Sequence, residues 1–345
     1  MINRMSRRRF AAGIAAAPWV VGTSPRANAG EEPFRLRCSL DTAPTHLRNV
    51  SISDYFNKLE TGSNGRMRPQ LFQSGQLFPD LRVGKALLEG QIEMAAPGHW
   101  TLTGLIPDAD FFQLPVLYGR SLEAVHKAME GGAGQLVAAQ IKQRLRARVL
   151  GPWLDLGFQN WYSTNKPLTA FDDLKGLKIR NPGGAGNAWR TRFMGGIPNT
   201  TAWPQVPLAL SQGTFDALIT SNESLASAKL WEAGIKYAIE DHQFVGEYIP
   251  IVSLGFWNRL PADLQALMTN LWNENIATYR ANMAAAQAQA RKLLESHGIK
   301  FFDPPPQEIA ELRKRMMAEQ DQLAKNIKLS PDLVKMVTAD VGDAS

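Results

Sequence analysis

The chain alternates short apolar runs with longer stretches whose apolar residues recur every three or four positions. The short runs predict strands, and the recurring pattern predicts amphipathic helices between them. We expect strands at 34–40, 69–72, 92–96, 147–151, 177–180, 197–201 and 215–221. This alternation is typical of an α/β protein with largely parallel sheets.

The expected helices differ mainly in length. Thr45 is placed to cap a helix that stops at Gly62, and helical spacing also covers 79–89 and 121–145. The longest stretch, 261–298, would be about 50 Å long, which is enough to join two domains. Its apolar residues do not keep coiled-coil positions over enough heptads to favour a coiled coil. Three prolines at 304–306 then precede a last amphipathic helix expected at 307–328.

Residues 1–29 have the three parts of an export signal. The arginines at 7–9 precede an apolar run at 11–21, and Ala27-Asn28-Ala29 is a small-residue cleavage pattern. That run is too short to span a bilayer, which needs about 20 apolar residues. The segment at 6–10 is also typical of a twin-arginine signal. We therefore expect periplasmic export and a mature protein that begins near Gly30; a membrane anchor or a basic nucleic-acid arm is the alternative.

The net charge changes meaning once this leader is set apart. The whole chain has 38 basic and 32 acidic residues, a formal charge of +6. The five charged residues of 1–29 are all arginines, and without them 33 basic residues face 32 acidic ones, which leaves +1. A nearly neutral mature protein gives no electrostatic reason to expect a nucleic-acid partner.

Cysteine and histidine usage excludes several kinds of site. The single cysteine, Cys38, can form neither an intrachain disulfide nor a cysteine-ligated zinc or iron–sulfur centre. The histidines show no HxxxH spacing, and no GxSxG, Walker A or strand-linked GxGxxG motif is present. We expect no metal, no cofactor and no enzyme activity. Because convergent triads need no local motif, an enzyme that uses Glu93, Asp155, His99 or Glu223 as acid or base is the alternative.

One strand end is suited to hold an anion. A short helix ends at Gly176, a strand ends at Arg180, and a turn at Gly183 and Gly184 leads into another helix. In open α/β sheets, ligands bind at the carboxyl ends of strands. A guanidinium there can hold a carboxylate with two parallel hydrogen bonds, and the following helix N-terminus presents N–H groups to the same charge. The alternative is that Arg180 is an exposed charge without a ligand.

Six short motifs follow one another along the mature chain. They are SGQL at 74–77, DFFQLP at 110–115, STNKPL at 163–168, LKGLKIR at 174–180, IP at 197–198 and LALSQGTFDA at 208–217. In order and spacing, this set resembles the solute-binding proteins of TRAP transporters, the tripartite ATP-independent periplasmic family. The resemblance covers nearly the whole mature chain.

The resemblance implies a fold and an activity. It implies a two-domain α/β periplasmic binding protein, class II-like, with a long domain-spanning helix. Domain 1 would be 30–151 with about 241–260, domain 2 would be 152–240 with about 299–345, and the spanning helix would be 261–298. Such a protein captures an organic acid in an interdomain cleft and delivers it, unaltered, to a TRAP-type permease. We expect a monomer; a ligand sensor for a membrane receptor is a further alternative.

The resemblance also implies ligand contacts. In that family the arginine that ends the LKIR strand, here Arg180, pairs with the substrate carboxylate. Many relatives have a second arginine where this chain has Gln159, so we expect a monocarboxylate, and tryptophans near the cleft favour an aromatic or apolar one. Asn222 is a further expected contact, although 218–223 departs from the family pattern, and no metal-binding motif of the 2-oxo-acid subgroup is apparent. The complete expected set is Arg180, Gln159, Trp161, Trp203, Asn222, Trp100 and Gln76.

Overall fold

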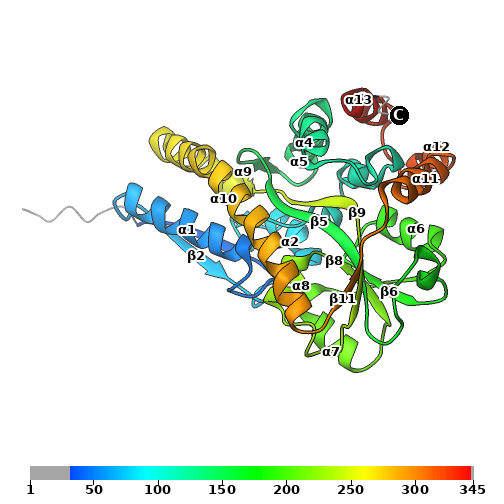
Figure 1. Cartoon of the computed structure of the whole chain (residues 1–345). Helices are drawn as coiled ribbons and strands as arrows, with labels where there is room; N and C mark the ends of the chain where they lie inside the picture. The colour runs from blue at the N-terminus through cyan, green and yellow to red at the C-terminus, as the bar shows by residue number, and fades with distance from the viewer. Residues whose placement is uncertain (1–31, 343–345) are drawn as a thin grey trace, which may run out of the picture. The chain divides into compact units, whose positions relative to one another are not determined.

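The strands of the protein form two separate sheets (Figure 1). The computed structural model describes residues 32–342, and the expected leader at 1–29 lies outside them. The first sheet has the order β2 (Met67–Phe72), β1 (Phe34–Ser39), β3 (Met94–Ala95), β10 (Ile251–Ser253) and β4 (Ala147–Val149). The second has the order β11 (Lys300–Phe302), β9 (Tyr237–Tyr248), β5 (Leu154–Ser163), β8 (Ala217–Thr220), β6 (Lys178–Asn181) and β7 (Ile197–Thr200).

Both sheets are mixed, so the expectation of largely parallel sheets is wrong. In the first sheet β1 runs parallel to β2 and β3, whereas β10 is antiparallel to β3 and β4. In the second sheet β6 is parallel to β7 and β8, whereas β5 is antiparallel to both β8 and β9. Local apolar patterns identify strands but carry no information on which strands pair, and the long strands β5 and β9 were not expected at all.

Helices make most of the connections. Their bounds are α1 (Leu47–Gly62), α2 (Asp80–Leu88), α3 (His99–Leu102), α4 (Leu122–Glu130), α5 (Gly132–Arg144), α6 (Ala185–Phe193), α7 (Val206–Ser211), α8 (Asn222–Ser227), α9 (Leu254–Trp257), α10 (Ala262–Ser296), α11 (Pro306–Met317), α12 (Gln320–Asn326) and α13 (Pro331–Val341). Four short 3-10 helices complete the described elements: Pro107–Gln113, Pro115–Leu117, Phe171–Leu174 and Trp203–Gln205.

Three expected helices differ from the observed ones. The stretch at 121–145 is broken into α4 and α5 at Gly131, which caps the end of one and the start of the other. The expected last helix at 307–328 is divided into α11 and α12, and α13 follows it. The first helix is capped by His46 and not by Thr45, because the His46 side chain accepts the hydrogen bond of the Arg48 N–H.

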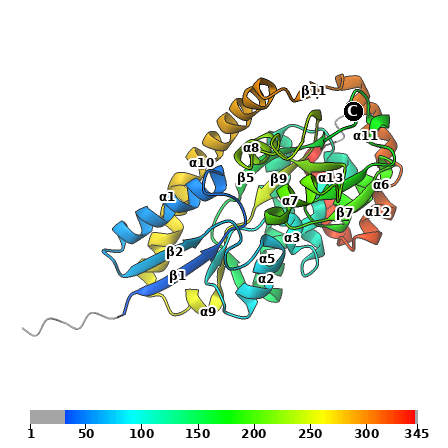
Figure 2. The same cartoon turned by 90° about the horizontal axis from the view of Figure 1, so that it is seen from below.

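The long helix α10 packs against α1, which covers β2 of the first sheet, and against α8 and β5 of the second sheet; Figures 1 and 2 show it beside α1. Near its start, Tyr55 of α1 packs edge-on against Trp272 at 5.4 Å and donates its hydroxyl hydrogen to the Met268 carbonyl oxygen. Near its end, Gln287 accepts from the Glu223 N–H and donates to the Leu156 carbonyl oxygen. No described helix, α10 included, is long and apolar enough to cross a membrane.

The chain passes between the sheets at three places, the last of them from β10 through α9 and α10 to β11. The first two crossings lie between β4 and β5 and between β9 and β10. The strands β5 and β9, which meet these crossings, pair along most of their length in the second sheet. A large apolar cluster extends from β1 and α1 to β5, β9 and α10, and Cys38 is buried within it as a free thiol. The proposed domain limits stay predictions.

Candidate functional site

A small enclosed cavity lies where segments of both sheets come together. Its volume is ≈ 30 Å³, room for one or a few water molecules. The carboxyl ends of β1, β6 and β8 meet there, in agreement with the rule that α/β sheets bind ligands at strand ends. The lining residues are Asp41, Thr42, Asp80, Leu81, Trp100, Thr101, Leu156, Gln159, Arg180, Pro182, Ala202, Trp203, Ile219, Thr220, Ser224 and Tyr248.

Arg180 is the one cationic side chain in this lining. It is 3% exposed, and its Nε and Nη1 donate to the carbonyl oxygens of Thr201 and Ile219 at 3.0 and 3.2 Å. Among residues 32–342, no carboxylate pairs with it and no acceptor meets Nη2. Burial lowers the pKa of Arg180 to about 10, although the charges of Asp41 and Tyr248 oppose this. The guanidinium therefore stays charged at neutral pH and retains donors for a ligand.

A second buried arginine, Arg48, is neutralised from two sides. Its Nη2 lies 2.7 Å from Asp41 Oδ1, its Nη1 lies 2.5 Å from Asp80 Oδ2, and its guanidinium stacks on the Tyr248 ring. Burial acts to lower the pKa of Arg48, but the charge of Asp80 together with those of Tyr248 and Asp41 raises it. Burial raises the pKa of Asp80, and the charge of Arg48 opposes that rise. This group thus presents two carboxylates, and not a free cation, to the cavity.

The structure brings together four of the seven residues expected to bind the ligand. Arg180, Gln159, Trp100 and Trp203 all line the cavity. The Gln159 amide donates to the Gly157 carbonyl oxygen, and Trp203 lies beside the Arg180 guanidinium.

The remaining three lie elsewhere in the structure. Trp161 is fully buried and donates from Nε1 to Asp241. Asn222 is hydrogen-bonded to Tyr162 and Glu240 and faces a different surface hollow. Gln76 is exposed and is not part of the lining.

Several lining residues were missed by the sequence analysis. Asp41 and Thr42 follow β1 directly, so the strand-end rule applied to every expected strand would have indicated them. Asp80 begins α2, and Tyr248 ends β9. Tyr248 had no comparable local signal, because β9 was not recognised and only its antiparallel pairing with β5 brings its end to the cavity.

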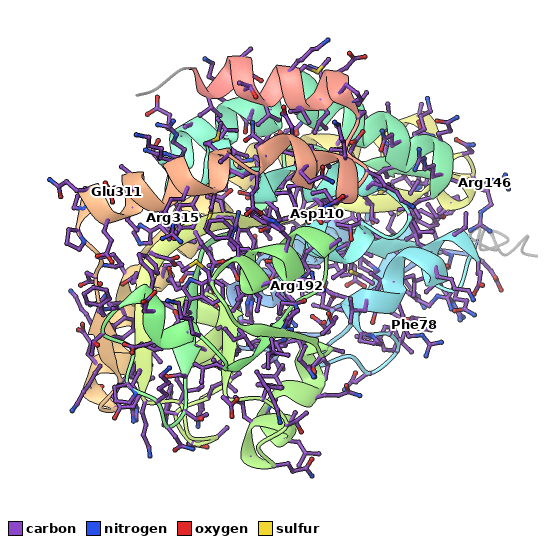
Figure 3. The ribbon with its side chains drawn as sticks, turned by 90° about the vertical axis from the view of Figure 1, so that its right-hand side faces the viewer. Phe78, Asp110, Arg146, Arg192, Glu311 and Arg315 are labelled. Atoms are coloured by element: carbon purple, nitrogen blue, oxygen red, sulfur yellow. The ribbon has the colours of Figure 1, made fainter. Side chains whose placement is uncertain are left out.

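The turn after Arg180 is held by close contacts with the other side of the cavity. Gly183 has a φ of +127°, and a Cβ there would lie 3.2 Å from Leu81 Cδ2 and 3.3 Å from the Trp100 carbonyl oxygen. The N–H of Gly186 in α6 donates to Asp110 Oδ2 at 2.8 Å, and Figure 3 shows Asp110 next to that helix. Burial raises the pKa of Asp110 to about 6. Any outward movement of the turn must break these contacts.

The four alternative acid–base residues do not form a catalytic group at the cavity, and none is part of its lining. Glu93 is paired with Arg37, and Glu223 bonds His46 and the Leu47 N–H. Burial lowers the pKa of His99 to about 3, so its imidazole is neutral at the pH where proton transfer would be needed. The fourth, Asp155, hydrogen-bonds His126.

Comparison with known proteins identifies the family. Residues 42–326 match the bacterial extracellular solute-binding proteins of family 7. This protein belongs to that family. The resemblance to TRAP solute-binding proteins is therefore confirmed.

Two relatives illustrate the range of the family. The chain is 26% identical, over 94% of its own length and 96% of the relative's, to the C4-dicarboxylate-binding periplasmic protein DctP of Rhodobacter capsulatus. It is 22% identical, over 76% of its length and 81% of the relative's, to the sialic acid-binding periplasmic protein SiaP of Vibrio cholerae.

Solved structures share the fold. The sugar acid binding protein DctPAm of Advenella mimigardefordensis, in complex with galactonate, matches with a TM-score of 0.84 at 19% identity, over 91% of this chain and 99% of that one. A TRAP periplasmic solute binding protein of Shewanella oneidensis with bound succinate matches with a TM-score of 0.81 at 22% identity, over 90% of this chain and 100% of that one. The expected two-domain α/β binding-protein fold, with its long helix, is thereby confirmed.

Proposed function

We propose that this protein captures an organic monocarboxylate in the cavity at Arg180 and delivers it to a TRAP-type membrane permease. The observation that carries the proposal is the buried Arg180 guanidinium, which lines the cavity without an acidic partner among residues 32–342. A buried cation without a counter-charge is costly. A ligand carboxylate would supply both the opposite charge and acceptors for the remaining N–H groups.

The charges around the cavity favour one carboxylate over two. Gln159 is neutral, and Arg48 is already paired with Asp41 and Asp80. A second carboxylate on the ligand would therefore face two acidic side chains and no free cation. This distinguishes the proposed ligand from the C4-dicarboxylates in the name of the Rhodobacter relative.

The rest of the lining favours hydroxyl groups on the ligand. Asp41 and Asp80 can accept hydrogen bonds, and the hydroxyls of Thr42, Thr220 and Ser224 can donate or accept. A hydroxylated monocarboxylate satisfies these groups, and the galactonate bound to DctPAm is an acid of this kind. The second candidate ligand is an aromatic or apolar monocarboxylate. It is favoured by the presence of Trp100 and Trp203 in the cavity lining.

Binding and release would require the cavity to open. At ≈ 30 Å³ it is too small for an organic acid unless its walls separate. We propose that the two sheets move apart about the crossings beside β5 and β9, and that bound ligand stabilises the closed state through its greater affinity for that state. Delivery would then occur when the cavity opens at the permease and releases the ligand.

Calorimetry with three acids tests the ligand class. Galactonate, benzoate and succinate differ in hydroxyl, aromatic and carboxylate content but share an anionic group. We expect the tightest binding to galactonate, with benzoate the second candidate; tight binding to succinate alone would refute the monocarboxylate proposal. Mass spectrometry of the acid after incubation distinguishes a carrier, which returns it unaltered, from an enzyme.

We also propose how the protein is exported and with what it assembles. We expect the exported protein to begin near Gly30 and to be a periplasmic monomer. N-terminal sequencing of the protein from the periplasm checks the cleavage, and light scattering checks the mass. Co-purification with a TRAP permease supports a transporter component, whereas co-purification with a receptor would support the sensor.

A further inference from the structure

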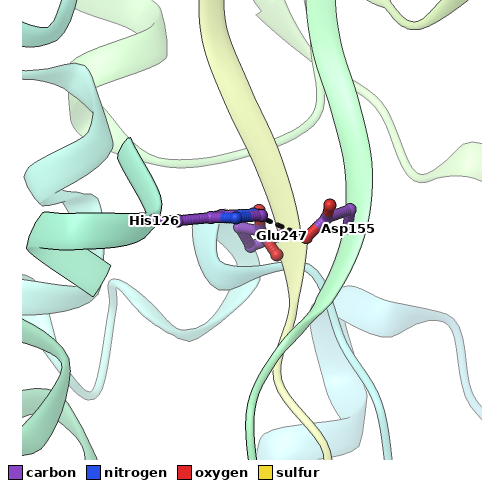
Figure 4. Close-up of side chains that lie close together, drawn as sticks. All are labelled: His126, Asp155 and Glu247. Carbon is purple, nitrogen blue, oxygen red and sulfur yellow. Dashed lines mark hydrogen bonds and ion pairs between the residues drawn. The ribbon is translucent and has the colours of Figure 1, made fainter. Parts of the chain in front are cut away.

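A histidine and two carboxylates meet on the wall of the protein that faces away from the ligand cavity. Figure 4 shows His126 of α4 directed toward Asp155 on β5 and Glu247 on β9. The His126 Nε2 lies 2.9 Å from Asp155 Oδ1 and 3.7 Å from Glu247 Oε1. One donor atom from each of the three lies within 4.8 Å of the others. Leu156 and Tyr248, the next residues on the two strands, line the cavity instead.

The two carboxylates oppose each other directly. Asp155 and Glu247 are partners in the antiparallel register of β5 and β9, so two like charges face each other across the strands. Such a pair destabilises a sheet unless a positive charge lies between its members. The pairing therefore needs a counter-charge at this point, which either a protonated His126 or a bound cation can supply.

Glu247 supplies an independent sign that a partner is missing. It is 0% exposed, and neither carboxylate oxygen has a hydrogen-bond partner among the described residues. Buried carboxylates are otherwise almost always hydrogen-bonded or bound to a metal. The nearest cationic donor outside the cluster, Arg280, contacts Asp155 at 3.2 Å but is also held by Glu130 and the Trp153 carbonyl oxygen.

We infer that His126, Asp155 and Glu247 bind a divalent transition-metal cation such as Zn²⁺. One imidazole and two carboxylates are a donor set suited to Zn²⁺ or Mn²⁺ and less suited to Ca²⁺, which takes oxygen ligands alone. Three protein ligands leave a position for water, and the side chain of His126 is 20% exposed to solvent.

The geometry requires only small movements. Tetrahedral Zn²⁺ with bonds of about 2.1 Å separates its donor atoms by roughly 3.4 Å. The observed separations of 2.9 and 3.7 Å lie on either side of that value. The carboxylates of Asp155, Glu247 and Glu130 and the guanidinium of Arg280 together carry a charge of −2 when His126 is neutral. A divalent cation would balance that charge.

Metal binding here should release protons. Burial acts to lower the pKa of His126, but its contacts with Asp155 and Glu247 outweigh this and raise it to about 9. Burial and the facing Asp155 charge also raise the pKa of Glu247. Because a metal binds only deprotonated ligands, affinity should increase with pH, and protons should leave as Zn²⁺ binds.

Calorimetric titration of the chelator-treated full chain with Zn²⁺ tests the inference. We expect one site, proton release in buffers of different ionisation enthalpy, and a rise in melting temperature. Glu247→Gln and His126→Gln should each weaken this site at least tenfold. The matched control, His297→Gln, removes an exposed histidine far along the chain and should leave it unchanged.

Two results would overturn the inference. One is the absence of stoichiometric binding of either Zn²⁺ or Mn²⁺ to the wild-type chain. The other is a site that persists with unchanged affinity in His126→Gln, a variant of a partly exposed side chain that should fold even if Glu247→Gln does not. In both cases the cluster would be an ion-paired brace between α4 and the two strands.

Discussion

The guanidinium carbon of Arg180 lies 5.4 Å from the centre of the Trp203 ring, in the wall of one cavity. The face of an aromatic ring attracts a guanidinium without occupying the N–H donors of the guanidinium. Two backbone carbonyl oxygens accept hydrogen bonds from Arg180 Nε and Nη1. The side chain is therefore held in place while part of its hydrogen-bonding capacity stays free, which is the arrangement expected of a preformed carboxylate site.

Replacing Arg180 by lysine should severely weaken binding of any acid that the protein captures. An ammonium group cannot form the two parallel hydrogen bonds, and burial would favour loss of its proton. We expect a loss of about 2–5 kcal/mol in binding free energy, which is more than a tenfold change in affinity. Calorimetry measures it. Arg192→Lys, an exposed position on α6, is the control, and equal affinity in the Arg180 variant would remove Arg180 from the site.

Replacing Gln159 by arginine should shift selectivity toward dicarboxylates. Gln159 is 2% exposed and lines the cavity, so the new guanidinium would add a second cation near Arg180. We expect the affinity ratio of succinate to galactonate to increase at least tenfold, about 1.4 kcal/mol. Gln159→Met, which adds no charge, is the control for altered packing. An unchanged ratio in the arginine variant would show that the charge at this position does not select the ligand.

Gly183→Ala should impair closure of the cavity. Alanine is strained at a φ of +127°, and its Cβ would press on Leu81 and on the Trp100 carbonyl across the cavity. Because the proposed opening of the cavity would separate these neighbours, we expect ligand affinity to fall more than stability. Gly213→Ala is a matched control, since Gly213 has a φ of +67° but nothing within 4 Å of a Cβ. Alanine at the left-handed φ of Gly213 costs about 1–2 kcal/mol. The φ of Gly183 lies outside that region and costs more, so the stability of both variants is measured beside their affinity; only Gly183→Ala should lose affinity.

The sequence predicts Arg180 and not Tyr248 for a physical reason. The strand, the glycine turn and the helix around Arg180 are consecutive, so local spacing is enough to place it at a strand end. Strand β9 instead carries Glu240, Asp241 and Glu247 in buried or half-buried positions, which hides the apolar pattern of a strand. Its role depends on tertiary partners that no local pattern encodes.

The tryptophans show the same limit. Their sequence neighbours, Gln159 and the helix start at Pro204, favour Trp161 and Trp203 equally as cleft residues. Trp161 lies on β5, and its indole N–H bonds Asp241, a carboxylate that also accepts from Tyr118. Trp203 begins the short 3-10 helix before α7 and lines the cavity. The pairing of β5 with β9 brings Trp161 next to Asp241. Because β9 was not expected from the sequence, this position of Trp161 could not be predicted.

His99 should make folding stability depend on pH. It is fully buried and stacks on Phe112, and burial lowers its pKa from 6.5 to about 3. Between these values the unfolded chain binds a proton that the folded protein does not, so stability is complete above pH 6.5 and is lost as the pH falls. From about pH 7.5 to about pH 5 this one group should cost about 2 kcal/mol.

Urea unfolding of the wild type and of His99→Gln at those two pH values isolates the effect. Other titrating groups contribute equally to both proteins, so the wild type should lose about 2 kcal/mol more than the variant on acidification. His297→Gln, which removes an exposed histidine, should behave like the wild type. If the wild type and His99→Gln lose the same free energy, His99 must take up its proton in the folded state near its ordinary pKa, and the packing around Phe112 must admit a charge.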